Sequence, residues 1–214
     1  MSRPKTKPAE PLPAARKQPA QLRSKERLEK ILACARELIA HKGSDQVKMS
    51  EVAALADISI GSLYQYFPDK SALIRTLAEH YNVESRRCIS TALEGVKDLD
   101  GLLQAYSSLV DQYFAIVTAE PVMRDIWSGM QADKTLMALQ LAESRACGEM
   151  LAAAMRRVHP KGNRRRMDES AFLIWELGEA TVRLAISVSP KEGRALVDTF
   201  KRLTVRELAD PGTD

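Results

Sequence analysis

Two short helical segments in close succession, within residues 48–70, constrain the fold of this chain more than any other feature. In KMSEVAALADIS, Ser50 is a suitable N-cap, and the small and aliphatic residues after it fit a helix of about two turns over 50–57. In SIGSLYQYFPDK, Ser59 is a suitable N-cap for a second short helix over 60–66. A helix this short is marginal in isolation, so both must pack against a neighbour.

That neighbour lies on their N-terminal side. Leucine, isoleucine and alanine recur with helical spacing between residues 28 and 39. Ser24 is a candidate N-cap for this helix, and Gly43 is a candidate residue for its C-terminal end. A longer helix followed by two short ones with a tight connection predicts a helix-turn-helix unit, whose last helix enters the DNA major groove.

The second short helix is rich in aromatic side chains: it holds Tyr64 and Tyr66 and is followed by Phe67, three of only eleven aromatics in the chain. We expect Leu63 and Phe67 to pack inward, while the tyrosines place an apolar ring on the core and a hydroxyl near DNA. A lysine at the start of the next helix suits a phosphate. The candidate DNA contacts are therefore Lys48, Ser50, Ser59, Gly61, Ser62, Tyr64, Tyr66 and Lys70.

Plainer interpretations of the same residues stay open. A tyrosine-rich short helix also fits an ordinary surface helix, half packed and half solvated. Lys48 fits a solvated surface charge, and Ser59 fits an N-cap without any contact to DNA.

The segment MSEVAALADISIGSLYQYFPDKSALI resembles the DNA-binding domain of the TetR family of transcriptional regulators, and the resemblance extends over about residues 24–84. It is carried by Ser50, Val52, Ala53, Ala56, Ser59, Gly61, Leu63, Tyr64, Phe67, Lys70 and Leu73. Asp57 stands where the family usually has glycine, and aspartate adopts a left-handed turn conformation less readily than glycine.

The N-terminal residues 1–23 are basic and rich in proline, with five of the chain's ten prolines. Residues 1–30 carry a net charge of +6, although the whole chain has only +4. Such a composition predicts a flexible arm. The arm is either a solvated tail or a segment that adds phosphate or minor-groove contacts beside the DNA-binding unit.

The remainder of the chain also has helical patterning and shows no alternation typical of strands, so the predicted fold class is all-α. Prolines separate several of the segments. Further helices are expected over roughly 100–118, 121–131, 133–158, 167–188 and 191–208. The resemblance implies that residues 85–208 form a larger helical domain for effector binding and dimerisation, followed by a tail over 209–214.

Residues 171–189 are apolar nearly all round, so this helix should be buried on two sides. One side would pack the domain core and the other a second subunit. With the following helix, it would supply half of a four-helix interface in a homodimer, through Ala195, Leu196, Phe200 and Leu203. The alternative is a central helix in a monomer.

An effector pocket would use the aromatic, methionine and acidic side chains of the larger domain. The candidates are Tyr113, Met123, Trp127, Met130, Trp175 and Glu179. The same apolar set also fits an ordinary core. Glu179 and Arg183 are four residues apart on one helix, so they either pair with each other or leave one charge as the polar determinant of the pocket.

Other function classes find little support. Cys34, Cys88 and Cys147 are far apart and form no metal motif, so we expect no disulfide framework, metal or cofactor. There is no apolar run long enough for a membrane span and no secretory signal, which predicts a cytoplasmic protein. No histidine neighbours a nucleophile pattern, so we expect no enzyme.

The sequence thus predicts a sequence-specific DNA-binding homodimer, a repressor that a small molecule releases from a palindromic double-stranded DNA operator. One alternative is a redox-sensing regulator that uses its cysteines, with Cys147 expected to be the most exposed thiol and Cys34 packed inside. A helical enzyme is the remaining alternative and has the least support.

Overall fold

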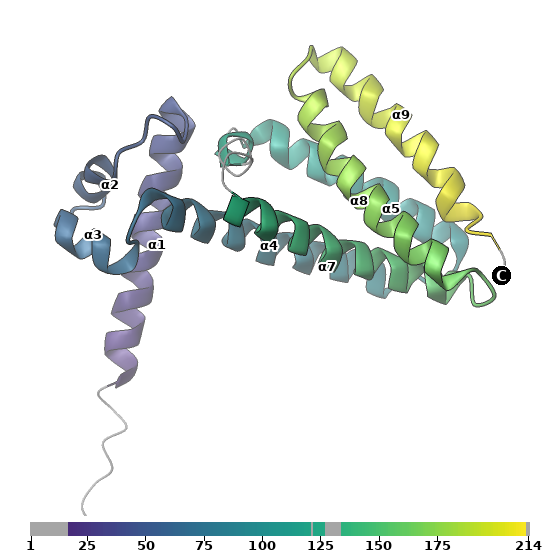
Figure 1. The fold of residues 1–214 in the computed structure, drawn as a ribbon, viewed down its shortest axis with the longest axis horizontal. Helices are drawn as coiled ribbons and strands as arrows, with labels where there is room; N and C mark the ends of the chain where they lie inside the picture. Colours follow the sequence, from purple (N-terminus) through teal and green to yellow (C-terminus); the bar gives the residue numbers. More distant parts are fainter. Residues whose placement is uncertain (1–16, 121, 127–133, 213–214) are drawn as a thin grey trace, which may run out of the picture.

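The computed structural model describes residues 17–120, 122–126 and 134–212, and these residues form helices and no strand, which confirms the all-α prediction. Figure 1 shows a small N-terminal part built on α1 and a larger bundle beside it, with α4 running from one into the other. The helices are α1 (Lys17–Lys42), α2 (Met49–Leu55), α3 (Ile60–Tyr66), α4 (Lys70–Glu94), α5 (Leu99–Ala119), α7 (Lys134–Val158), α8 (Arg164–Ala185) and α9 (Pro190–Ala209), and residues 122–126 are helical as well.

Two of the predicted helix starts are wrong. α1 begins at Lys17, so Ser24 lies inside the helix and residues 17–23 of the predicted arm are helical. Pro19 falls in the first turn, where proline is tolerated because the backbone N–H groups there have no partner within the helix. α2 begins before Ser50, with Lys48 at the N-cap position, and the Glu51 carboxylate accepts a hydrogen bond from the Lys48 backbone N–H at 2.9 Å.

The turn between α2 and α3 has a left-handed conformation at Asp57, the position where the resembled family usually has glycine. Asp57 has φ 55°, and the backbone N–H groups of Asp57 and Ile58 donate to the carbonyls of Ala54 and Ala53 at 3.2 and 3.0 Å. This pair of bonds closes α2 in a Schellman motif. Ser59 then caps α3, as predicted: its hydroxyl accepts a hydrogen bond from the Ser62 backbone N–H at 3.1 Å.

α4 belongs to both parts of the molecule. Asp69 caps its N-terminus, where its carboxylate accepts a hydrogen bond from the Ala72 backbone N–H. Leu73 and Leu77 pack in the core of the small domain, together with side chains of α1, α2 and α3. About three turns further on, Ile89 packs in a second core with α5, α7 and α8. The helix therefore links the small N-terminal domain directly to the larger bundle.

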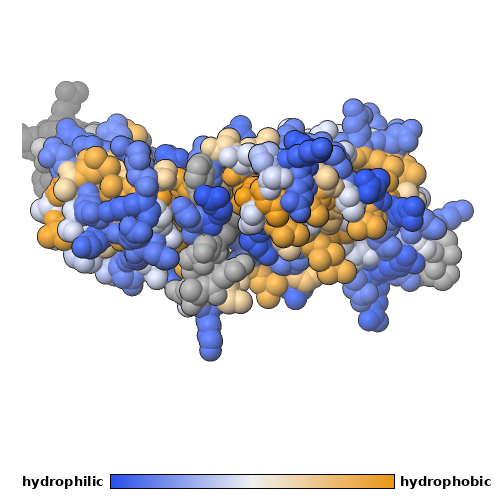
Figure 2. Space-filling model, turned by 90° about the horizontal axis from the view of Figure 1, so that it is seen from above, coloured by the Kyte–Doolittle hydropathy of each residue, from blue (hydrophilic) through white to orange (hydrophobic). Residues whose placement is uncertain are grey.

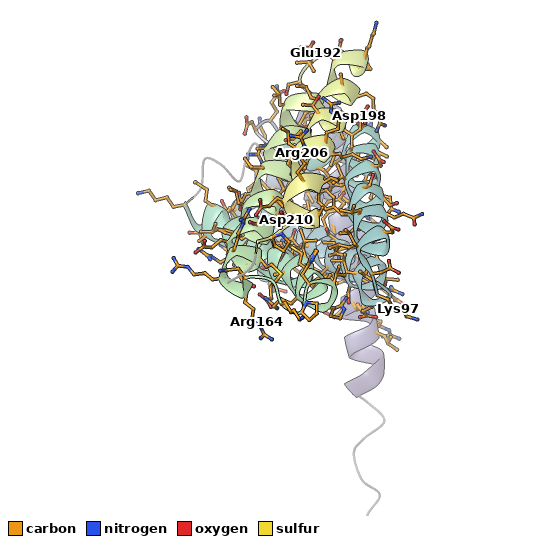
Figure 3. The ribbon with its side chains drawn as sticks, turned by 90° about the vertical axis from the view of Figure 1, so that its right-hand side faces the viewer. Lys97, Arg164, Glu192, Asp198, Arg206 and Asp210 are labelled. Atoms are coloured by element: carbon orange, nitrogen blue, oxygen red, sulfur yellow. The ribbon has the colours of Figure 1, made fainter. Side chains whose placement is uncertain are left out.

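In the larger bundle, α8 packs against both α7 and α9, and Figure 3 shows α5, α8 and α9 side by side with charged residues such as Asp198 and Arg206 on the surface of α9. Two glycines allow close helix contacts. A Cβ on Gly148 would lie 2.9 Å from the Phe172 Cα, and a Cβ on Gly193 would lie 2.3 Å from the Ala185 carbonyl oxygen. Larger residues at either position would force the helices apart.

Candidate DNA-binding surface and ligand cavity

One face of α3 is open to solvent and the other is buried. Leu63 and Phe67 are buried in the small domain's core, as predicted. On the opposite face Ser59 and Gly61 are exposed, and 49% of the Tyr64 surface is accessible. No atom outside the immediate backbone lies within 4 Å of the Cβ position at Gly61. The start of α3 can therefore be approached closely by a large partner.

The remaining predicted DNA contacts differ in the exposure of their side chains and in their contacts with the rest of the protein. Lys48 and Ser50 are exposed at the start of α2, and Ser62 is partly exposed. Tyr66 packs its ring against the core, and its hydroxyl lies 3.5 Å from the Ser24 Oγ of α1. The tyrosine ring is thus anchored, and its hydroxyl lies beside α1. A contact of any of these side chains with DNA stays a prediction.

Lys70 already has partners inside the protein. Its Nζ donates to the backbone carbonyls of Ser44 and Asp45 at 3.1 and 3.0 Å. These carbonyls belong to the loop that joins α1 to α2, so Lys70 ties this loop to the start of α4. These bonds give the ammonium group a structural role, and the phosphate contact predicted for Lys70 stays a prediction.

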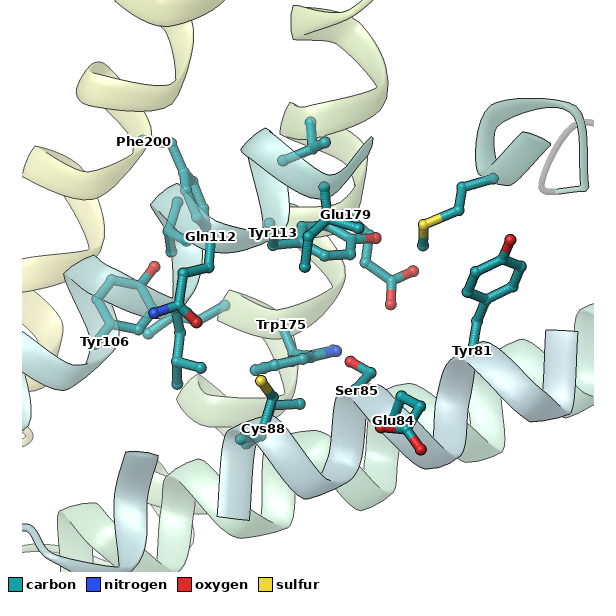
Figure 4. Close-up of a pocket in the computed structure, with 18 residues that line it drawn as sticks. Tyr81, Glu84, Ser85, Cys88, Tyr106, Gln112, Tyr113, Trp175, Glu179 and Phe200 are labelled. Carbon is teal, nitrogen blue, oxygen red and sulfur yellow. The ribbon is translucent and has the colours of Figure 1, made fainter. Parts of the chain in front are cut away.

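A cavity of about 230 Å³ lies between α4, α5, α8 and α9 (Figure 4). It is lined mainly by apolar and aromatic side chains. The polar side chains of its wall come from α4, α5 and α8 and include Glu84, Ser85, Gln112 and Glu179. An apolar wall with a few polar groups is typical of a small-molecule site, and the volume is slightly below the roughly 300–1,000 Å³ of such pockets.

Four of the six predicted ligand residues line this cavity: Tyr113, Met123, Trp175 and Glu179. The other two, Trp127 and Met130, lie outside the described residues. Sequence reasoning missed Tyr106 and Phe200, and also the contribution of α4, which supplies Tyr81, Glu84, Ser85 and Cys88. Their spacing along one face of a helix was a signal that could have been used.

Glu179 is the most unusual group of the wall. The Gln140 side chain donates a hydrogen bond to the Glu179 carboxylate at 2.5 Å. Burial, and then repulsion from Glu176, raise the pKa of Glu179 to about 7, against opposing effects from Arg183 and the hydrogen bonds of Gln140 and Trp175. Within the described chain, the ion pairs include none between Glu179 and Arg183. Of the two interpretations left open for Glu179, the structure favours the polar determinant of a pocket.

The neighbouring tyrosine also titrates outside its ordinary range. Burial, and then the Glu179 carboxylate, raise the pKa of Tyr113 well above its usual value. Tyr113 therefore stays neutral at physiological pH. Figure 4 shows its ring beside the Glu179 carboxylate, on the same side of the cavity.

A smaller hollow of about 40 Å³ continues from the cavity towards α7. Of its two acidic residues, Glu143 is buried but paired, because Arg86 donates to its carboxylate at 2.5 Å. Cys147, predicted to be the most exposed thiol, is instead buried here, and burial, followed by the nearby Glu143 carboxylate, raises its pKa. Cys88 is the exposed cysteine and Cys34 is half-buried. A thiol such as Cys147 is a poor nucleophile.

The outer face of α8 and α9 carries exposed leucines. Leu184 and Leu203 are 53% and 66% accessible, and Leu173 and Leu177 extend the same face along α8. Figure 2 shows hydrophobic surface over the larger domain, interrupted by hydrophilic side chains. Phe200, which the sequence placed with the interface residues, is buried and lines the cavity instead.

The helical turn 122–126 connects the cavity with the DNA-binding domain. Met123 lines the cavity, whereas Val122 and Ile126 are buried in the core of the small domain. The Ser44 hydroxyl, in the loop between α1 and α2, donates to the Asp125 backbone carbonyl at 3.1 Å. A single turn of helix is therefore in contact with the cavity on one side and with the DNA-binding unit on the other.

The described residues hold no group of three or more potential metal ligands. None of the helices in the described part combines the length and the apolar composition needed to cross a lipid bilayer.

Comparison with known proteins agrees with both halves of this description. Residues 31–77 match the model of bacterial regulatory proteins of the tetR family, and residues 100–211 match that of the tetracyclin repressor-like C-terminal domain. The uncharacterized HTH-type transcriptional regulator YvdT of Bacillus subtilis is 31% identical over 109 residues, which are 50% of this chain and 55% of YvdT. The HTH-type transcriptional repressor KstR of Rhodococcus jostii is 39% identical over 64 residues, 29% of this chain and 30% of KstR.

The chain thus spans about half, or less, of the length of these relatives. Solved structures share the fold over nearly the whole chain. A TetR-family regulator from Streptomyces coelicolor has a TM-score of 0.67 at 23% identity and covers 86% of this chain and 96% of its own. GusR of Salmonella enterica has a TM-score of 0.64 at 21% identity, with the same shares covered. Because the C-terminal domain model alone matches more than half of the residues, the chain belongs to the TetR family of DNA-binding transcriptional regulators.

Proposed function

We propose that this regulator represses transcription as a homodimer on a palindromic operator and that a small molecule bound in the cavity releases it. The observation that carries the proposal is the shared helical turn 122–126, which contacts both the cavity and the DNA-binding core. A ligand that moves Met123 also acts on Val122 and Ile126, and thereby on the domain that carries α3. The DNA partner makes the cytoplasm the expected location.

Dimerisation would use the exposed leucines of α8 and α9. Leu173, Leu177 and Leu184 recur along one side of α8, and Leu203 adds to them from α9. Covering these side chains with the same face of a second copy removes apolar surface from water. A two-fold dimer would present two α3 helices to a palindrome, whose half-sites lie roughly 34–36 Å apart when they are one helical turn apart.

Release requires that the ligand bind two conformations unequally. In the operator-bound conformation, the two α3 helices must match the spacing of the half-sites. A ligand that fits the cavity better in another arrangement of 122–126 shifts the population away from the operator-bound conformation. The shift in free energy cannot exceed the difference between the ligand's binding free energies for the two conformations.

The test is selection of an operator from random DNA, followed by affinity measurements on variants of the exposed face. We expect Lys48→Ala to weaken binding to all sequences and to lower the salt dependence by about one phosphate contact. Lys191→Ala, which removes an exposed lysine from the first turn of α9, is the matched control. Tyr64→Phe removes only a hydroxyl and should weaken the selected operator. If Lys48→Ala and Tyr64→Phe both bind the selected operator as tightly as the parent protein does, this face does not contact DNA.

A further inference from the structure

The ionisable side chains around the cavity all belong to one charge class. Its wall contains two carboxylates, Glu84 near the exposed side of α4 and Glu179 on α8. Among the described residues, neither the cavity nor its smaller extension is lined by lysine, arginine or histidine. The described wall of the cavity therefore carries carboxylates and no basic side chain.

Two carboxylates beside the cavity, the buried Glu143 and the half-buried Glu179, differ in the partner that each one has. Glu143 has a cation, since Arg86 donates to it at 2.5 Å. Glu179 has a neutral partner, the Gln140 amide, at the same distance. Removing an anion from water is costly unless an opposite charge compensates it. Arg183 acts on the Glu179 charge without forming an ion pair with it, so a cationic ligand could supply the ion pair that Glu179 lacks among the described residues.

The aromatic residues of the wall suit a cation as well. Tyr81, Tyr106, Tyr113, Trp175 and Phe200 come from four different helices. Figure 4 shows the Trp175 and Tyr113 rings on either side of the approach to the Glu179 carboxylate. Ring faces attract a cation placed within roughly 6 Å, and the attraction grows when the cation is removed from water.

From the geometry of these groups we infer that the effector, whose role rests on the proposed function, is a hydrophobic organic cation whose ammonium or amidinium group pairs with Glu179. Its apolar body would lie against the aliphatic and aromatic wall formed by α5, α8 and α9. An effector with a carboxylate would bury its charge beside Glu84 and Glu179, with no basic side chain of the wall to compensate it.

Three compounds with one skeleton test the charge class directly: 4-phenylbutylamine, 4-phenylbutanol and 4-phenylbutanoate. Isothermal titration of the full-length protein at pH 8 should rank the amine at least about tenfold above the alcohol, with the carboxylate weakest. The proposal is overturned if the carboxylate binds as well as the amine, if the alcohol equals the amine, or if the amine does not bind at concentrations up to about 1 mM.

Two matched variants then locate the effect. Glu179→Gln keeps the shape and removes the charge, and it should reduce amine affinity about tenfold while leaving the alcohol within about twofold. Glu169→Gln makes the same change on an exposed turn of α8, where Glu169 pairs with Arg165, and should leave amine affinity unchanged. If Glu179→Gln binds the amine like the parent, Glu179 is not the counter-ion and the proposal fails.

Measurements of operator affinity distinguish a failure of the proposed ligand class from a failure of the proposed release by a ligand. If the amine binds through Glu179 but does not weaken operator binding, the ligand class stands and release by this ligand fails. If the carboxylate releases the operator and the amine does not, release stands and the cationic class is overturned. The expected result is that the amine binds through Glu179 and also lowers operator affinity.

Discussion

The small DNA-binding domain and the larger bundle are built from similar helices, but they differ in what they bury. In the small domain, Ile31 of α1, Leu63 of α3 and Leu77 of α4 meet in one apolar core. The larger domain instead surrounds a cavity of about 230 Å³, beside which Glu143 is buried and Glu179 is half-buried. The small domain has a packed apolar core, whereas the larger one has a cavity and a half-buried carboxylate without an ion pair among the described residues, both of which a ligand can use.

The largest expected effect concerns the outside of the larger domain. Leu184→Arg would place a charge in the proposed α8–α9 interface and should weaken the dimer by about 3–5 kcal/mol, leaving monomers at micromolar concentration. Sedimentation velocity measures this. Leu22→Arg changes an equally exposed leucine on α1 and should leave the dimer intact. A parent protein that sediments as a monomer would remove the basis for the dimer.

The contrast in packing predicts that a leucine-to-alanine substitution lowers the free energy of unfolding more in the small domain than beside the cavity. Leu63→Ala empties a fully buried position of the small core and should cost about 3 kcal/mol of unfolding free energy. Leu109→Ala enlarges a cavity that already exists and should cost about 1 kcal/mol. Urea unfolding followed by circular dichroism compares the two variants. Equal losses would indicate that the larger domain is packed as tightly as the small one around these positions.

The raised pKa of Glu179 should make the stability of the protein depend on pH. Glu179 has a folded-state pKa of about 7, raised from the ordinary value of 4.5. The neutral form is therefore favoured in the folded state, and this contribution is complete below pH 4.5 and lost as the pH rises to 7. At pH 8 Glu179→Gln should be more stable than the parent by about 2–3 kcal/mol, and the difference should vanish towards pH 4.5.

Thermal unfolding at a series of pH values tests this, with Glu169→Gln as the control that shows no such trend. Other groups around Glu179 must be considered when the curve is interpreted. The ionisable side chains that line the cavity and its extension or act on the Glu179 charge are Tyr81, Glu84, Cys88, Tyr106, Tyr113, Glu143, Cys147, Glu176 and Arg183. If Glu179→Gln and the parent keep a constant difference from pH 5 to pH 8, the Glu179 carboxylate has an ordinary pKa.

A smaller effect is expected at the contact that joins the two domains. Ser44→Ala removes the hydrogen bond to the Asp125 carbonyl and should reduce the coupling between ligand and operator by about 1 kcal/mol. The coupling is the ratio of operator affinities with and without ligand. Ser90→Ala removes a serine hydrogen bond to Glu94 elsewhere on α4 and should leave the ratio unchanged. An unchanged ratio in Ser44→Ala would show that this contact does not transmit the signal.

The sequence predicted the DNA-binding domain in more detail than the larger one. The cap of α3 at Ser59, the burial of Leu63 and Phe67 and the end of α1 at Gly43 all depend on neighbours within a few residues, and the structure confirms them. The errors at Ser24 and Ser50 show the limit of this approach, because a good capping residue does not determine where a helix begins.

The larger domain was harder because its cavity is formed by residues far apart in the chain. Tyr81, Tyr113, Trp175 and Phe200 lie on four helices, and only their packing shows that they surround one space. Helical periodicity cannot distinguish a residue that fills a core from one that lines a cavity, which is why Phe200 was placed in the interface. For the same reason Cys147 was expected at the surface, although it lies at the centre of the helix contacts.

The central claim is that the occupant of the cavity and the operator act on the same two states of the protein. Coupling between two ligands is reciprocal, so it can be measured from either side. Tryptophan fluorescence should give a weaker affinity for 4-phenylbutylamine in the operator complex than in free protein, by the same factor by which the amine weakens operator binding. Equal affinities of the amine for the free and the operator-bound protein would contradict the claim.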